Sequence, residues 1–62
     1  MKHDLSPRQR EILRLAAKGK TNKEIASDLS IAVATVAHHM SLILARLGAK
    51  SRTEAAVKFL CR

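Results

Sequence analysis

The side chains of this 62-residue sequence that could do chemistry are mainly cations, with 12 Lys and Arg against 5 Asp and Glu and a formal net charge of +7. A surplus of this kind favours a polyanionic partner, with nucleic acid first and an anionic membrane surface second. Phe59 is the single aromatic residue, so unpaired bases would find no platform on which to stack. Among nucleic acids, the expected partner is therefore a duplex.

The other reactive side chains form no catalytic or metal-binding pattern. His38 and His39 are adjacent and would point about 100° apart on a helix. Glu24 and Asp28 have no third ligand at a suitable spacing. Cys61 is the only cysteine, which excludes an internal disulfide or cysteine-cluster metal site and fits a reducing cytoplasm. We therefore expect no enzyme activity, no metal and no cofactor.

The length and hydropathy of the chain indicate a single small domain. At this size a domain buries only about 60% of the surface that its unfolded chain exposes, so its stability should be marginal. The sequence has no signal peptide and no apolar run of about 18 residues. We expect no membrane span, no export and a cytoplasmic location.

Two helices, predicted over residues 22–29 and 33–47, are the elements that position the charged residues. Thr21 and Glu24 have the spacing of a capping box, which starts the first helix. The turn is Ser30-Ile31-Ala32, and Gly48 is the left-handed residue expected after the second helix. The buried stripe of the second helix is predicted to be Val36, Met40, Ile43 and Leu47. This layout indicates either a helix-turn-helix or an αα-hairpin in a small bundle.

Two further helices, over residues 7–18 and 52–61, are predicted to brace this pair. The capping boxes Ser6–Gln9 and Ser51–Glu54 open them, and Gly19 ends the first. Their inward faces are predicted to hold Ile12, Leu15 and Ala16, with Leu13 at the edge, and Ala55, Ala56, Phe59 and Leu60. The expected fold is all-α, a compact four-helix domain over residues 1–62.

In a helix-turn-helix, the side of the second helix opposite its buried stripe faces the bases of the major groove. The base-contact candidates there are Ala34, Ala37, His38 and Ser41, with Leu42 and Ala45 on the same face. No Lys or Arg occurs between Lys23 and Arg46. Readout would come from His38, Ser41 and alanine contacts with a thymine methyl, all weaker than an Arg–guanine pair of about 1–3 kcal/mol. His39, at the edge of the stripe, is predicted to be a hydrogen-bonded core-edge residue.

Positive charge surrounds the 33–47 helix and does not lie on its outer face. The phosphate-contact candidates are Lys20, Lys23, Thr35, Arg46, Lys50 and Arg52. The alternative for each of them is an ordinary solvated surface residue. On the last helix, Val57 and Cys61 point outward, as either scattered surface residues or an interface.

A set of spaced motifs runs through nearly the whole chain: LSPRQREIL at 5–13, NKEIA at 22–26, Leu29, Ile31, Thr35-Val36, His39, Leu47-Gly48 and SRTEA at 51–55. Together they resemble the DNA-binding domain of the LuxR/GerE family of bacterial transcription regulators, of the response-regulator output type. The resemblance implies double-stranded DNA as partner, and it matches Lys23, Thr35 and Arg52 to motif positions. It also implies a homodimer through the C-terminal helix, with Val57 and Cys61 at the interface, and is compatible with an N-terminal regulatory domain absent from this chain.

This sequence departs from the family pattern on the second helix of the pair. The family usually has Lys or Arg at the positions of Ala37 and Ser41, and Ser or Thr at that of Ala32. Without a side-chain cap at Ala32, the helix loses about 1 kcal/mol. These departures leave the sequence specificity open.

Three functions are therefore compared. The first is a DNA-binding domain of a transcription regulator. The second is a protein-interaction module that uses the apolar outer face of the same helix, which the missing Lys and Arg favour. The third, membrane binding, is the weakest, because the positive residues are spread over all faces.

Overall fold

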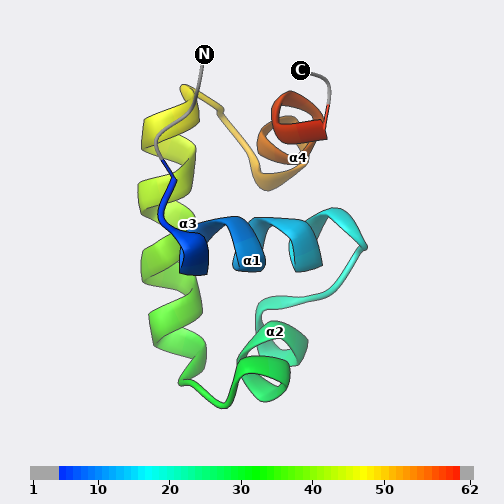
Figure 1. The fold of residues 1–62 in the computed structure, drawn as a ribbon, viewed down its shortest axis with the longest axis vertical. Coiled ribbons are helices and arrows are strands. Elements are labelled where there is room, and N and C mark those ends of the chain that lie inside the picture. Colours follow the sequence, from blue (N-terminus) through cyan, green and yellow to red (C-terminus); the bar gives the residue numbers. More distant parts are fainter. Residues whose placement is uncertain (1–4, 61–62) are drawn as a thin grey trace.

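The computed structural model describes residues 5–60, which form four helices: α1 (Pro7–Ala17), α2 (Asn22–Leu29), α3 (Val33–Leu47) and α4 (Arg52–Leu60). In Figure 1, α3 is a column, and α2, α1 and α4 are stacked along one side of it in that order. The central helix of the stack, α1, contacts all three others. The predicted all-α fold is confirmed, and the other side of α3 is left open.

Two reciprocal capping boxes start α1 and α2, as predicted. Ser6 Oγ accepts from the Gln9 N–H (3.1 Å), and Gln9 Oε1 accepts from the Ser6 N–H (3.0 Å). Thr21 and Glu24 repeat the arrangement at 3.2 and 2.8 Å. Each pair satisfies two backbone donors that a helix start would otherwise leave without partners.

One helix boundary and one capping box differ slightly from the prediction. Lys18 is the cap of α1 and not its last residue, because the chain turns at Gly19, whose φ is 92°. Ser51 Oγ caps α4 by accepting from the Glu54 N–H (3.1 Å), but the Glu54 carboxylate accepts from the N–H of Lys50 (2.6 Å), one residue before the expected position. The Leu60 side chain and residue 61, assigned to this helix from sequence, lie outside the described part.

The core draws on all four helices and on the segment before α1. Its buried hydrophobic residues are Leu5, Ile12, Leu13, Ile25, Ala26, Val36, Met40, Ile43, Leu47 and Ala55. The predicted stripe of α3 is confirmed. The prediction for α1 is wrong in one respect, because Leu13 is fully buried and Leu15 and Ala16 are half-buried. A helix packed between several others buries more than one stripe, which explains the fully buried pair Ile12 and Leu13.

Candidate nucleic-acid interface

The α2–α3 pair has the geometry of a helix-turn-helix. The helix axes of α2 and α3 differ in direction by 110°, which is within the roughly 90–120° that is typical of this motif. Ser30 ends α2 in the left-handed conformation with φ 57°, and the Ile31 N–H donates to the Ala26 carbonyl (3.0 Å). Ile31 then packs, half-buried, against the core. These contacts fix the angle at which α3 leaves α2.

The structure brings all four base-contact candidates together on the open side of α3. Ala34, Ala37, His38 and Ser41 are all exposed, as are Leu42 and Ala45. The exposure predicted for this face is thus confirmed, whereas contact with bases stays a prediction. Most of its side chains end in carbon, and the polar groups are few.

Val33 is a further exposed apolar residue of α3, on the side of the buried stripe and not on the outer face. It is the first residue of α3 and is 47% exposed, similar to Leu42 at 41%. Its spacing from Val36 would continue the buried stripe, yet the stripe stops at Val36. Its position as the first residue of α3 could have indicated this exposure, because the residues that cover the buried stripe do not extend to the start of the helix.

The start of α3 has no side-chain cap, as predicted. Ala32 occupies the cap position with an extended backbone, and only its carbonyl takes part, accepting from the N–H groups of Thr35 (3.0 Å) and Val36 (3.2 Å). The N–H groups of a first helical turn are natural donors to a phosphate.

Four of the phosphate-contact candidates are exposed. Lys23 and Thr35 lie in the first turns of α2 and α3, while Arg46 lies in the last turn of α3 and Lys50 follows that helix. Because an α-helix rises about 1.5 Å per residue, Thr35 and Arg46 are separated by most of the length of α3. Polar side chains therefore lie near both ends of its apolar face.

Lys20 already has an ion-pair partner, which the sequence did not indicate. Its Nζ donates to Asp28 Oδ2 at 2.7 Å. This hydrogen bond, together with the negative charge of Asp28, raises the pKa of Lys20 above its ordinary value. To reach a phosphate, the ammonium group would have to leave Asp28.

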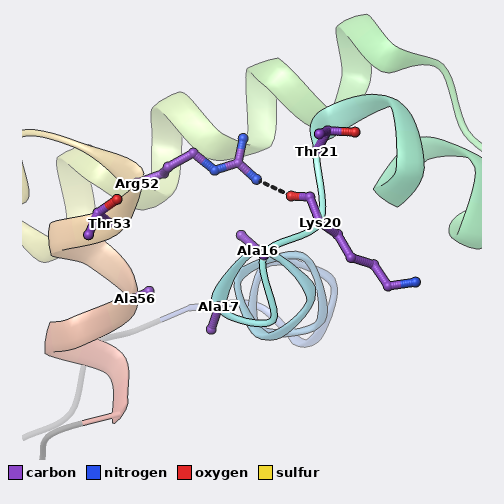
Figure 2. Close-up of a pocket in the computed structure, with 8 residues that line it drawn as sticks. Ala16, Ala17, Lys20, Thr21, Arg52, Thr53 and Ala56 are labelled. Carbon is purple, nitrogen blue, oxygen red and sulfur yellow. Dashed lines mark hydrogen bonds between the residues drawn. The ribbon is translucent and has the colours of Figure 1, made fainter.

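Arg52 connects α4 to the start of α2. Its Nη1 donates to Asn22 Oδ1 (2.8 Å), and its Nη2 donates to the Lys20 carbonyl (2.7 Å), the bond drawn in Figure 2. Among the described residues α2 and α4 do not pack against each other, so this guanidinium is a direct link between them. Any phosphate contact by Arg52, which stays a prediction, would have to use its remaining N–H groups.

An open pocket of about 470 Å³ lies beside this link, between the end of α1 and the start of α4. Its lining consists of Ala16, Ala17, Gly19, Lys20, Thr21, Arg52, Thr53 and Ala56. In Figure 2 the Lys20 ammonium points away from the pocket, and Arg52 reaches across to the Lys20 carbonyl. Three of these eight residues are alanine and one is glycine, and the two cations among them have hydrogen-bond partners outside the pocket or across its edge.

Within residues 5–60, His39 does not make the hydrogen bond at its Nδ1 that the prediction of a hydrogen-bonded core-edge residue required. The residue is half-buried at the edge of the α3 stripe, as predicted, but its Nδ1 is buried and has no hydrogen-bond partner among the described residues. Its helical neighbours toward the stripe, Val36 and Ile43, are apolar and offer no side-chain acceptor.

On α4, Val57 is 54% exposed, which agrees with its predicted outward position. Cys61, the other residue assigned to a dimer interface, lies outside the described residues. Within residues 5–60, no three His, Cys, Asp or Glu side chains gather as metal ligands would.

In the same part of the chain, no single helix is both long and apolar enough to cross a membrane. The α2–α3 pair reaches that length and apolarity only with a bend of 110°.

Comparison with known proteins places this sequence in a known family. The luxR family of bacterial regulatory proteins matches residues 3–59. The spore germination protein GerE of Bacillus subtilis (strain 168) is 45% identical over 56 residues, which are 90% of this chain and 76% of GerE. The uncharacterized transcriptional regulatory protein YvfU of the same strain is 52% identical over 52 residues, or 84% of this chain and 26% of YvfU.

The nitrate/nitrite response regulator protein NarL of Escherichia coli (strain K12) is 47% identical over 55 residues, or 89% of this chain and 26% of NarL. The chain therefore spans about a quarter of the length of YvfU and NarL, and about three quarters of that of GerE.

Proposed function

This chain belongs to the luxR family of bacterial regulatory proteins, and on that basis we propose that it binds double-stranded DNA with α3 in the major groove. One observation supports this most directly: α3 leaves α2 at 110° and keeps its outer side uncovered by the other helices. A helix that enters a major groove needs such a free side. The protein then acts in transcription regulation in the bacterial cytoplasm.

Phosphate contacts supply most of the binding free energy in this proposal. Lys23 and Thr35 contact the backbone beside the starts of α2 and α3, and Arg46 and Lys50 contact it beyond the end of α3. These four side chains are all exposed, and the formal net charge of +7 adds a general attraction to DNA. Lys20 and Arg52 contribute less, because Asp28, Asn22 and a backbone carbonyl already accept their hydrogen bonds.

The protein binds its site as a homodimer that pairs through α4. The exposed Val57 supports this arrangement, because it offers an apolar surface on a helix whose Ala55 is already used by the core. A two-fold dimer would read a two-fold site in the DNA. An N-terminal regulatory domain in a longer protein stays a prediction.

A protein-interaction module is the second candidate. The exposed side chains of Val33 and Leu42, at 47% and 41%, favour it, because they would suit a protein surface as well as a groove.

Titration of duplex DNA at several salt concentrations separates the two functions. If about four phosphates are neutralised per protomer, log K should fall against log salt with a slope of about −3.6, at about −0.9 for each phosphate. An affinity for DNA that does not change with salt would contradict the proposal and favour a protein partner. A random-sequence duplex of equal length is the control for the share of binding that depends on sequence.

A further inference from the structure

The outer side of α3 lacks the side chains that usually read base edges through paired hydrogen bonds. Between Val33 and Ala45 there is no Arg, Lys, Asn, Gln, Asp or Glu. These are the types that recognise guanine, adenine or cytosine in the major groove. The exposed polar side chains of this stretch are Thr35, His38 and Ser41. Arg46 follows only in the last turn, far from the bases below the start of the helix.

The exposed carbon groups of the same face have a better match in the groove. Ala34 and Ala37 lie on the outer face of α3, and Leu42, which is 41% exposed, lies on the same side of the helix. Every base pair turns polar groups toward the major groove, but a G·C pair has no methyl group beside them, so apolar side chains would meet only polar groups left without partners. A thymine turns its C5-methyl group to the same place, and burial of that methyl against carbon is favourable.

We propose that this face recognises the C5-methyl groups of thymine, so that the preferred ligand is a thymine-rich major groove. The proposal rests on the function proposed above and adds the chemical class of site that α3 selects. Ala34 and Ala37 are small, so the helix can approach the bases closely. They are separated by about 4.5 Å along the helix axis, which suits methyl groups on neighbouring base pairs. His38 and Ser41 then refine the choice by single hydrogen bonds.

The test begins with selection of binding duplexes from a randomised library by the 62-residue chain. Thymine-rich sites are the expected result, and recovery of G·C-rich sites would overturn the inference. In a selected site, each contacted thymine is then replaced by uracil, which removes the methyl and keeps every hydrogen-bonding group. Affinity should fall about fourfold for each contacted methyl, the factor that corresponds to about 0.8 kcal/mol. The same number of thymine-to-uracil replacements outside the selected site should have no effect on affinity.

A matched pair of variants links the effect to the start of α3. Ala34→Ser and Ala45→Ser both add one hydroxyl to an exposed alanine of α3, the first at the start of the helix and the second near its far end. With Ala34→Ser, the affinity ratio between thymine and uracil duplexes should fall toward one at the base pair that faces the start of α3. With Ala45→Ser, the ratio should stay at the wild-type value, and an equal loss in both variants would overturn the assignment.

The outcomes for the wild-type protein distinguish the two levels of inference. Salt-dependent binding with equal affinity for thymine and uracil duplexes would overturn the methyl readout and leave the proposed DNA binding intact. Failure to bind any duplex at low salt would overturn the proposed function itself.

Discussion

Substitution of Arg52 distinguishes a structural link from a phosphate contact. The guanidinium donates to Asn22 Oδ1 at 2.8 Å and to the Lys20 carbonyl at 2.7 Å. Arg52→Lys keeps the positive charge but loses the planar fork that spans two acceptors. If the main role of Arg52 is to connect α4 to the start of α2 through these two hydrogen bonds, Arg52→Lys should therefore destabilise the fold nearly as much as Arg52→Ala.

The size of the effect follows from the two hydrogen bonds. Arg52 is half-buried, so each bond should contribute about 1 kcal/mol net and their loss about 2 kcal/mol. In a domain of 60–100 residues, each 1 kcal/mol shifts Tm by about 4–8 °C. The expected decrease for either variant is therefore roughly 8–16 °C. Asn22→Ala, which removes one acceptor, should give about half of this decrease.

Thermal and urea unfolding followed by far-UV circular dichroism measure the change. Lys23→Ala, at an exposed position of the neighbouring helix, is the control and should stay within about ±0.5 kcal/mol of wild type. An Arg52→Lys protein with wild-type Tm would refute the reasoning. In that case the charge alone would matter, and a role at the phosphate backbone would regain support.

The remaining predictions concern the DNA, the dimer and the start of α3. Lys23→Ala should flatten the slope of log K against log salt by about 0.9, while Arg10→Ala, the same charge change on the exposed part of α1, should leave it unchanged; equal slopes for the two variants would remove Lys23 from the interface. Val57→Glu should leave the fold intact and abolish self-association in sedimentation experiments, and a wild-type protein that stays monomeric at high concentration would contradict the dimer. Ala37→Lys should tighten duplex binding in anisotropy titrations with stability within about ±0.5 kcal/mol; an unfolded variant or an unchanged affinity would mean that this face does not enter the groove. Ala32→Ser should raise the free energy of unfolding in urea by about 1 kcal/mol, because the cap position already has the extended backbone that a capping serine needs, and no gain would show that the first turn of α3 frays in solution.

Those parts of the fold that depend on neighbouring residues could be predicted from the sequence. Thr21 and Glu24 satisfy each other three residues apart, and Gly48 ends α3 through its own backbone conformation, with φ 66°. Leu13 could not be placed in this way. Its burial depends on how α1 is packed among the other helices, and a periodic stripe describes only one contact surface.

The candidate site could be predicted as a surface but not as a set of interactions. The outward direction of Ala37 and His38 follows from helical periodicity, and the structure agrees. The partners of the cations do not follow from it, because Arg52 meets Asn22 across 30 positions of sequence and Lys20 meets Asp28 across 8. A count of charges treats each cation as free, whereas folding decides which of them are already engaged.

Affinity and selectivity are thus assigned to different side chains of the same helix pair, and this separation has a measurable consequence. A methyl group carries no charge, so replacement of thymine by uracil should lower affinity at every salt concentration by the same factor and leave the slope unchanged. Removal of the Lys23 charge should do the opposite, changing the slope but not the ratio between thymine and uracil duplexes. If instead both changes alter both quantities, α3 does not keep one position in the groove. Base and phosphate contacts would then depend on each other.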